Sequence, residues 1–488
     1  MKVFIVTEGS QNIGFGHITR CVSLYQAFEE KGIIPKFIIN GDESISDFIN
    51  SKNYLIFNWI KEKRRLYRLV ENADIAIIDS YLAKISFYKN LSNLVKLSVY
   101  LVDVNEIDYP KGVVVNGNIC LEEVDYPVRA ENTFLLGTKY IPLRKEFWHV
   151  PKKEITDKVK SVMITFGGSD VRNMTPWILR LLRENFPDLT KYTVIGKAFP
   201  NLNEINKETD NKTVLVCSPN AKKMKEIMLE SDIAISSGGQ TVYELARIGI
   251  PTIGIAVADN QLSNVKAWKS KGFFECVCWH SESNLMEKLK KSIEYLKDVD
   301  TRKTKSAIGR EIVDGQGSLN IVKKVLSIFL KNKMTLREAT IRDSSQLFDL
   351  SNDPVVRKNS YNQDKIEWHQ HLKWLKRKLL DKDHVFFVVT DNLNKFYGQV
   401  RFDIDSKKEE SIINISLKKN IRGLGLSSFV IDKSIDDLLK IKRVKLIKAY
   451  IKEENISSIK SFERANFRFL KNFTYEGTKS KIYVRDVK

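Results

Sequence analysis

The sequence has few cysteines and no long apolar run, and each absence excludes a class of protein. The five cysteines are an odd number without the spacing of a disulfide framework or a Cys-x-x-Cys motif, so we expect reduced thiols and no metal site. No apolar run is long enough to span a membrane, and the apolar segment 2–7 is too short for a signal peptide. We therefore expect a cytoplasmic protein without a membrane span.

The charge of the chain is strongly one-sided but is not gathered in one place. The net charge of +20 is typical of proteins that bind nucleic acid, but the lysines are scattered through the expected helices and strands rather than collected in a tail. We therefore expect no nucleic-acid partner. The same basic surface suits anionic small molecules such as nucleotide sugars and coenzyme A. At 488 residues and 43% hydrophobic composition, the chain can build about three domains of roughly 150 residues each.

A glycine-rich segment near the N-terminus organises the first part of the chain. Residues 2–7 are a short apolar run typical of a buried parallel strand, and residues 21–28 have the apolar spacing of a helix. Gly14, Gly16 and His17 lie between them, where open α/β sheets bind ligands. Histidine can move protons near neutral pH. A structural turn with a helix-capping histidine is the alternative, and spacing alone leaves it equally open.

Further strands are expected near residues 36–40, 73–79, 97–104 and 113–116, alternating with helical segments, which indicates a parallel sheet. Polar residues follow several of these strands: Asp79, Tyr81, Asp103 and Asn116. If the sheet is parallel, they gather at the same edge as the glycine-rich segment. For two of them, Asp103 and Asn116, we favour a role as helix caps and turn formers.

The middle of the chain repeats the pattern of strand, glycine turn and helix. A strand at 161–166 is followed by Gly167 and Gly168, and a strand at 233–237 is followed by Gly238 and Gly239. Free N–H groups at the start of a helix near residue 240 can hold a pyrophosphate. Glu244 lies one turn inside this helix, where its carboxylate suits ribose hydroxyls; an acid that merely favours the first helical turn is the alternative. A strand from 251 then leads to a polar loop with Asn260 and Gln261.

After a short basic hinge at 331–333, the pattern changes to a strand hairpin and a neighbouring strand at 411–417. A second glycine loop at 420–428 then opens an apolar helix that reaches about Leu439. His369 and His371 lie on an expected helix, where we favour surface positions. Their i, i+2 spacing does not place them on one helical face, so we reject a metal site there.

Residues 14–21 closely resemble the opening motif of the UDP-sugar hydrolases of pseudaminic acid biosynthesis, and residues 77–81 resemble a second motif of that family. The resemblance covers about residues 1–330 and implies a GT-B fold, with His17 and Tyr81 in catalytic roles and a structural role for Arg144. It also implies a set of UDP-sugar-binding residues. These are Gly14, Gly16, Gly167, Gly168, Gly238, Gly239, Glu244, Asn260 and Gln261.

The C-terminal part resembles the GNAT superfamily of N-acetyltransferases, through the glycine loop and the segment 455–467. The resemblance implies acetyl-CoA as co-substrate. It implies the coenzyme-binding set Leu417, Arg422, Gly423, Leu424, Gly425, Ser427 and Asn455. Two positions depart from the family: Asn420 replaces the usual first residue of the loop, and Phe462 stands where many members have a tyrosine general acid. The acid is then another group, such as Tyr450, or solvent.

Together these observations predict an α/β chain in which a GT-B pair of Rossmann-like domains, 1–150 and 151–332, precedes a GNAT α+β domain, 333–488. The resemblances imply two consecutive reactions, N4-acetylation of a UDP-linked 4-amino-4,6-dideoxy-N-acetyl-altrosamine and inverting hydrolysis of the diacetamido product to free sugar and UDP. The alternatives are a GT-B glycosyltransferase, a hydrolase for another diamino sugar of legionaminic acid or spore coat type, and a non-enzymatic nucleotide-sugar or nucleic-acid binding protein. Sugar stereochemistry, channelling between sites and oligomeric state stay open.

Overall fold

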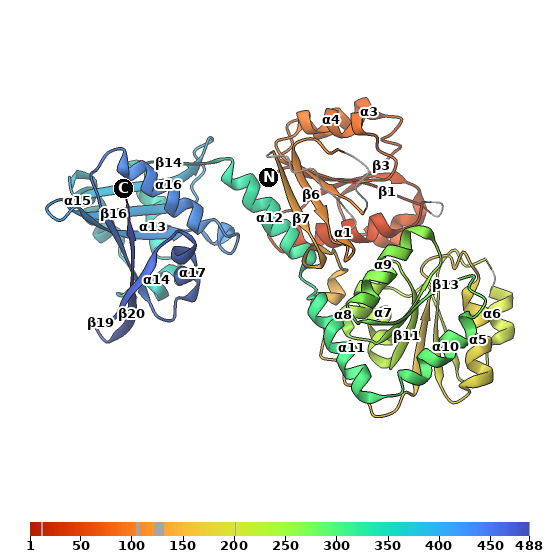
Figure 1. Ribbon diagram of the computed structural model, residues 1–488. Helices are drawn as coiled ribbons and strands as arrows, with labels where there is room; N and C mark the ends of the chain where they lie inside the picture. The colour runs from red at the N-terminus through yellow and green to blue at the C-terminus, as the bar shows by residue number, and fades with distance from the viewer. Residues whose placement is uncertain (11–12, 104–107, 122–130, 201, 488) are drawn as a thin grey trace. The chain divides into compact units, whose positions relative to one another are not determined.

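The computed structural model describes residues 1–10, 13–103, 108–121, 131–200 and 202–487. The chain forms two compact units, Met1–Val322 and Lys323–Lys488. The first unit contains two parallel sheets with helices around them, and the second contains one mixed sheet (Figure 1). The predicted fold class, a Rossmann-like pair followed by a GNAT-like sheet domain, is therefore confirmed.

The first sheet has the order β3-β2-β1-β4-β5-β6-β7, and all its strands are parallel. Its strands are β1 (Val3–Gly9), β2 (Lys36–Gly41), β3 (Tyr54–Ile56), β4 (Ile75–Asp79), β5 (Ser98–Leu101), β6 (Gly112–Asn116) and β7 (Asn132–Leu136). Its helices are α1 (Gly16–Glu29), α2 (Ser46–Ile49), α3 (Lys63–Val70) and α4 (Ile85–Leu94). Every residue of β1 and β4 is buried, as the apolar runs predict. The strand order reverses between β1 and β4, which is where open α/β sheets bind ligands.

The second sheet, β10-β9-β8-β11-β12-β13, repeats this plan and reverses between β8 and β11. Its strands are β8 (Ser161–Thr165), β9 (Thr190–Ile195), β10 (Thr213–Cys217), β11 (Ile233–Ser237), β12 (Thr252–Ala256) and β13 (Phe274–Trp279). The helices of this part are α5 (Met174–Asn185), α6 (Leu202–Glu208), α7 (Ala221–Glu230), α8 (Thr241–Ile248), α9 (Asp259–Ser270), α10 (Leu285–Tyr295), α11 (Val299–Ile312) and α12 (Gly317–Lys331). Both predicted glycine turns thus follow the two strands at the reversal.

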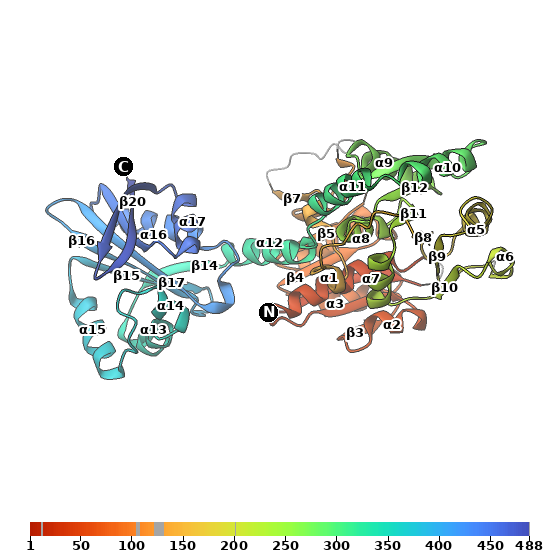
Figure 2. The same ribbon diagram turned by 90° about the horizontal axis from the view of Figure 1, so that it is seen from below.

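The sheet of the second unit has the order β14-β15-β16-β17-β18-β20-β19. Its strands are β14 (Met334–Glu338), β15 (His384–Asp391), β16 (Gly398–Asp405), β17 (Glu410–Leu417), β18 (Leu446–Lys452), β19 (Arg468–Tyr475) and β20 (Thr478–Asp486). Its helices are α13 (Ser344–Ser351), α14 (Pro354–Asn359), α15 (Trp368–Leu380), α16 (Ser427–Leu439) and α17 (Ile456–Arg464). Figure 2 shows α13, α14 and α15 on one face of this sheet and α16 and α17 on the other.

Two neighbouring strands of this sheet, β17 and β18, are paired over only part of their length. β17 pairs with β16 along its whole length, and β18 pairs with β20 along its whole length. Between them, β17 and β18 pair in parallel only over residues 410–412 and 446–448. The remaining residues of the two strands diverge, which opens the middle of the sheet.

Several predicted boundaries differ from the observed ones. The strand expected at 97–104 is shorter, because β5 ends at Leu101; residue 104 lies outside the described residues. Asn260 and Gln261, expected in a loop, form part of the first turn of α9. The hairpin of β15 and β16 and the neighbouring strand β17 are confirmed. In the part of the chain that the structure describes, no helix combines the length and apolarity needed to cross a membrane.

We predict that Gly196→Ala destabilises the first unit, whereas Gly168→Ala does not. A Cβ at Gly196 would lie 2.3 Å from the carbonyl oxygen of Gly168, which belongs to the backbone and cannot rotate away. A Cβ at Gly168 would meet no atom within 4 Å. Overpacking of this kind costs about 1–3 kcal/mol. Thermal denaturation measures the difference, and equal melting temperatures for the two variants would contradict this account of the packing.

Candidate functional site

The first site lies at the ends of β1 and β4, where His17 meets a buried carboxylate. His17 is the second residue of α1, and Asp79 is the last residue of β4. The Nδ1 atom of His17 lies 2.6 Å from Oδ1 of Asp79. Asp79 is completely buried, and His17 is only 5% exposed. The strand order places these two residues together, because β4 lies beside β1 and the helix after β1 begins at the same edge.

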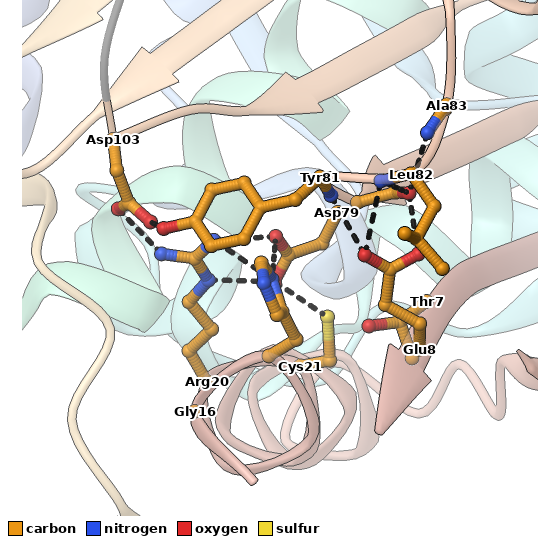
Figure 3. A network of polar contacts seen from close by, with 12 residues as sticks. Thr7, Glu8, Gly16, Arg20, Cys21, Asp79, Tyr81, Leu82, Ala83 and Asp103 are labelled. Atoms are coloured by element: carbon orange, nitrogen blue, oxygen red, sulfur yellow. Dashed lines mark hydrogen bonds and ion pairs between the residues drawn. The ribbon is translucent and has the colours of Figure 1, made fainter. Parts of the chain in front are cut away.

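Arg20 completes the surroundings of Asp79 (Figure 3). It lies one helical turn after His17, and its Nε and Nη2 atoms donate to the two oxygens of Asp79 at 2.6 and 2.5 Å. Burial opposes ionisation of Asp79, but the charge of Arg20 and the hydrogen bonds from Arg20 and His17 outweigh it and hold the pKa of Asp79 well below its usual range. Asp79 is therefore a carboxylate that accepts a hydrogen bond from Nδ1 of His17.

This arrangement favours one tautomer of His17. A guanidinium only donates hydrogen bonds, so the contact of 3.0 Å between Nη2 of Arg20 and Nδ1 competes with the shorter contact to Asp79. The ionised Asp79 only accepts hydrogen bonds, so its contact of 2.6 Å with Nδ1 requires the proton of the neutral ring on Nδ1. Nε2 then keeps a lone pair. A neutral histidine oriented in this way can act as a general base.

Tyr81 lies against the same histidine. Its ring meets the His17 ring edge-on, with centroids 4.4 Å apart, and its hydroxyl donates to Asp103. Desolvation and the carboxylate of Asp103 raise the pKa of the Tyr81 hydroxyl well above its usual range, so the phenol stays protonated. The backbone N–H of Tyr81 donates to Oε1 of the buried Glu8 at 2.7 Å, which anchors the turn after β4.

The structure adds two residues to the network around His17. Asp103 accepts from Nη1 of Arg20 at 2.5 Å and from Tyr81; residues 104–107, which its expected role as a cap or turn former would involve, lie outside the described residues. Asn116 is a turn former as expected, since it accepts from the N–H of Asn118. Asp79 was expected at the same sheet edge as His17 and lies there, whereas Arg20 and Glu8 were missed as parts of the network. An acid at the end of an apolar strand, as at Glu8, is a signal that could have indicated a buried role.

The glycines predicted to bind the UDP-sugar do not share one role. The N–H of Gly238 donates to the side chain of Gln261 at 3.2 Å, and a Cβ at Gly238 would lie 2.5 Å from Val265 of α9. Gly238 is therefore needed for the close packing of α9, and its N–H already has a partner. Gly239 has only Ser237 Oγ at 4.0 Å near a Cβ, and Gly168 has open space. Gly14, Gly16 and Gly167 also meet no atom within 4 Å, so backbone at these three positions is accessible to a ligand.

Glu244 lies in the first turn of α8 and is held by Arg144. The Nε and Nη2 atoms of Arg144 donate to the two carboxylate oxygens at 2.7 and 2.6 Å. Burial lowers the pKa of Arg144, but the charge of Glu244 outweighs this and raises it. The pair fixes the orientation of Glu244 beside the turn that contains Gly239. Asn260 lies exposed in the first turn of α9.

The second site is the opening between β17 and β18. It forms a cavity of about 670 Å³, and five residues of the predicted coenzyme set line it. These are Leu417, Arg422, Gly423, Ser427 and Asn455. Leu424 is buried in the core instead. Gly423 and Gly425 adopt the left-handed conformation, with φ of 76° and 75°, which favours glycine, and each has open space beside it.

Two of these residues serve the backbone rather than the cavity. Arg422 donates through Nε to the carbonyl of Leu417 at 2.7 Å and pairs through Nη1 with Asp353 at 2.9 Å, so its side chain ties the loop to α14. Asn455 caps α17 by accepting from the N–H of Ser458 at 3.1 Å. The loop therefore offers backbone N–H groups to a ligand.

The same cavity is also lined by aromatic side chains and a histidine. Phe462 forms part of the wall and is 3% exposed, and Tyr450 lines the same cavity. His369 is exposed as expected. The surface position expected for His371 is wrong: it is 2% exposed and its Nε2 lies 3.0 Å from the carbonyl of Ser344, because α15 packs this face against α13. Burial lowers the pKa of His371. Among the described residues, no group of three or more His, Cys, Asp or Glu side chains is arranged to hold a metal ion.

Comparison with known families agrees with this geometry. Residues 333–468 match the acetyltransferase (GNAT) domain, and residues 166–315 match the glycosyltransferase family 28 C-terminal domain. The spermidine N-acetyltransferase of Vibrio cholerae, solved with CoA and spermine, is 17% identical over 32% of this chain and 96% of that chain, with a TM-score of 0.30.

Three curated relatives cover between about half and nearly all of the chain. An uncharacterized protein of Methanocaldococcus jannaschii is 25% identical over 96% of this chain and 97% of its own length. The UDP-2,4-diacetamido-2,4,6-trideoxy-beta-L-altropyranose hydrolase of Campylobacter jejuni is 24% identical over 56% of this chain and 98% of its own length. The Helicobacter pylori pseudaminic acid cytidylyltransferase and UDP-2,4-diacetamido-2,4,6-trideoxy-beta-L-altropyranose hydrolase is 24% identical over 56% of this chain and 48% of its own length. The chain therefore joins an α/β unit similar to curated UDP-sugar hydrolases to a domain that matches the acetyltransferase (GNAT) model.

Proposed function

We propose that the chain is a bifunctional nucleotide-sugar enzyme of pseudaminic acid biosynthesis. Its GNAT domain acetylates the 4-amino group of UDP-4-amino-4,6-dideoxy-N-acetyl-beta-L-altrosamine with acetyl-CoA. Its first unit then hydrolyses UDP-2,4-diacetamido-2,4,6-trideoxy-beta-L-altropyranose to the free sugar and UDP. The observation that carries the proposal is the contact between His17 Nδ1 and the buried carboxylate of Asp79, because it leaves Nε2 of His17 available as a general base at the carboxyl ends of β1 and β4.

In the hydrolysis, Nε2 of His17 accepts a proton from water as the water oxygen attacks the anomeric carbon. Asp79 stabilises the imidazolium that forms, and Tyr81, held as a neutral phenol, orients the sugar or the water. The bond between the anomeric carbon and UDP breaks, and the start of α8 at Gly239 takes up the charge on the leaving diphosphate. Glu244, fixed by Arg144, accepts hydrogen bonds from the ribose hydroxyls.

In the acetyl transfer, the backbone of the loop 420–428 holds the coenzyme pyrophosphate, because Gly423 and Gly425 let it approach closely. The neutral acceptor amine attacks the thioester carbon, and its nitrogen loses one proton to solvent. The carbon–sulfur bond breaks, and the thiolate takes a proton from Tyr450 or from solvent, so that the products are the amide and the free thiol. Residues 1–150 and 151–332 then serve as the two halves of the hydrolase and residues 333–488 as the acetyltransferase. A solely nucleotide-binding protein would need neither the GNAT domain nor the histidine–carboxylate pair.

A second candidate function is sugar transfer to an acceptor other than water. The match of residues 166–315 to a glycosyltransferase domain favours it, as does a relative named spore coat polysaccharide biosynthesis protein from Bacillus subtilis, 20% identical over 56% of this chain and 82% of its own length. UDP release in water alone distinguishes the two functions, since a transferase needs its acceptor. Mass spectrometry of the UDP-4-amino-sugar with acetyl-CoA tests the main proposal by following acetylation and UDP loss together.

We predict that His17→Ala lowers the rate of UDP-sugar hydrolysis by about 10²–10⁴-fold, because general-base assistance contributes about that much. Asp79→Asn should lower it as well, since an amide cannot stabilise the imidazolium. Steady-state hydrolysis assays measure both, with acetylation as an internal check on folding and His369→Ala as the histidine control. Early NMR spectra should show an inverted anomeric configuration. Retained configuration, or near-normal turnover in His17→Ala, contradicts the mechanism.

We predict that Glu244→Gln weakens UDP binding about tenfold, because a charged acceptor of ribose hydrogen bonds is lost while the size of the side chain is kept. Isothermal titration calorimetry with UDP measures the affinity. Glu287→Gln, which changes an exposed acid of α10, is the matched control and should bind UDP normally. Unchanged affinity in Glu244→Gln would remove this residue from the nucleotide site.

We predict that Gly425→Val abolishes acetylation but spares hydrolysis of a substrate that is already acetylated. The side chain would block the backbone that holds the coenzyme and would strain a left-handed residue. Gly477→Val, at a φ of 76° in the turn between β19 and β20, imposes the same strain away from the loop and is the control. Thiol release from acetyl-CoA measures the first activity. Loss of both activities in a folded Gly425→Val protein would refute two independent sites.

A further inference from the structure

The described residues that line the cavity of the second unit include basic side chains but no acidic ones. Among the described residues that line it there is no Asp or Glu, although four lysine and arginine side chains are present. They are Arg357, Arg401, Arg422 and Lys452. Arg422 is paired with Asp353, and Lys452 donates to the carbonyl of Lys358 at 3.0 Å. The other two arginines contribute charge to the same end of the cavity.

Arg357 is held entirely by neutral groups. Its guanidinium donates to the carbonyls of residues 351, 362 and 364 and to Ser360 Oγ at 2.5 to 3.4 Å. These contacts fix its position but leave its charge uncompensated. The positive charge of Arg357 lowers the pKa of Arg401, so the two guanidinium groups lie close enough to repel each other.

Arg401 has its polar atoms left for a ligand. With the described residues it forms neither a hydrogen bond nor an ion pair, and its guanidinium carbon lies 5.1 Å from the centre of the Trp374 ring. Burial is the main cause that lowers the pKa of Arg401. The charge of Arg357 lowers it further, and the charge of Asp403 raises it. Asp403 itself pairs with Lys378 and His384. A planar guanidinium held against an aromatic ring presents a fork that matches phosphate geometry.

The register of the sheet separates Arg401 from the coenzyme loop. Arg401 lies opposite Asn414 of β17 and opposite Phe386 of β15. Phe386 belongs to the core under α13 and α15, so Arg401 faces those helices. Asn414 precedes Leu417 by three residues, or about 10 Å of strand, and the glycine loop starts only after Leu417. Arg401 therefore lies near the point where β17 and β18 part, away from the loop that would hold the coenzyme pyrophosphate.

We propose that Arg401 binds a phosphate oxygen of the acetyl acceptor and makes the acetyltransferase selective for an amino sugar that is still attached to its nucleoside diphosphate. This inference rests on the proposed function of the domain. Arg357 adds attraction for the same anion, and Trp374 holds the Arg401 guanidinium flat. Among the described residues that line the cavity, a cationic polyamine would meet two guanidinium groups that form no ion pair, and no carboxylate. Acetylation must then precede removal of UDP.

The test compares Arg401→Gln and Arg401→Lys with the wild type, using the full chain. For the UDP-4-amino-sugar, Arg401→Gln should raise KM about 10–100-fold, as expected for a lost hydrogen bond to a charged group, while KM for acetyl-CoA stays unchanged. The KM of Arg401→Lys for this substrate should lie between the values of the wild type and Arg401→Gln. For the same amino sugar without UDP, all three proteins should have equal KM. Arg377→Gln, at an exposed position of α15, is the control. Equal KM of wild type and Arg401→Gln for the UDP-linked acceptor would overturn the proposal.

A binding measurement separates this inference from the proposed function. Inorganic pyrophosphate is titrated into CoA-saturated wild type and Arg401→Gln by calorimetry, so that any other phosphate site is the same in both. If the wild type acetylates no UDP-amino-sugar, the proposed function fails, but a pyrophosphate-binding step that is lost in Arg401→Gln still supports the anion site. Identical isotherms for the two proteins overturn it. Acetylation of spermidine by the wild type as fast as of the sugar nucleotide would also overturn it.

Discussion

The buried carboxylate of Asp79 is the group on which the first site depends. A completely buried charge is costly unless it is paired and hydrogen-bonded, and Asp79 reaches Arg20, His17 and the thiol of Cys21. All three partners come from α1, whereas Asp79 comes from β4. The pairing therefore holds only because β1 and β4 are neighbours in the sheet. The same carboxylate that orients His17 also keeps α1 in place on the sheet.

The low pKa of Asp79 connects this site to stability. Because the pKa is lower in the folded protein than in the unfolded chain, the contribution of Asp79 to folding is fully present above its ordinary value of about 4. It is lost progressively as the pH falls below that value towards the folded pKa. The thiol of Cys21 has the opposite response, since burial and the Asp79 carboxylate raise its pKa. Cys21 therefore stays a neutral donor to Asp79 at neutral pH.

The two units create their sites by different means. In the first unit, the strand order reverses between β1 and β4 and between β8 and β11. Polar side chains and glycine turns gather at the ends of these strands. In the second unit, the sheet itself opens, because β17 and β18 pair over only three residues each. The first arrangement gives a compact network of charges that fix one another. The second gives a cavity whose walls are strand residues and whose charge is left for ligands.

The sequence by itself determined the elements and the loops. Apolar runs predict β1, β4, β8 and β11, and glycines predict the turns after β1, β8 and β11, because these features depend on neighbours along the chain. Even so, glycine spacing did not distinguish Gly238, which is required by packing against Val265, from Gly239, which has open space. That distinction depends on where α9 lies.

Only the tertiary structure decided which polar groups meet. Arg144 and Glu244 are separated by 100 residues, and Arg20 and Asp103 by 83, yet each forms a direct ion pair. The burial of His371 and the position of the Arg401 guanidinium against Trp374 likewise follow from the packing of α15 on its sheet. Local periodicity carries no information on such contacts, because the partner of a charged side chain is set by strand order and helix placement rather than by its neighbours in sequence.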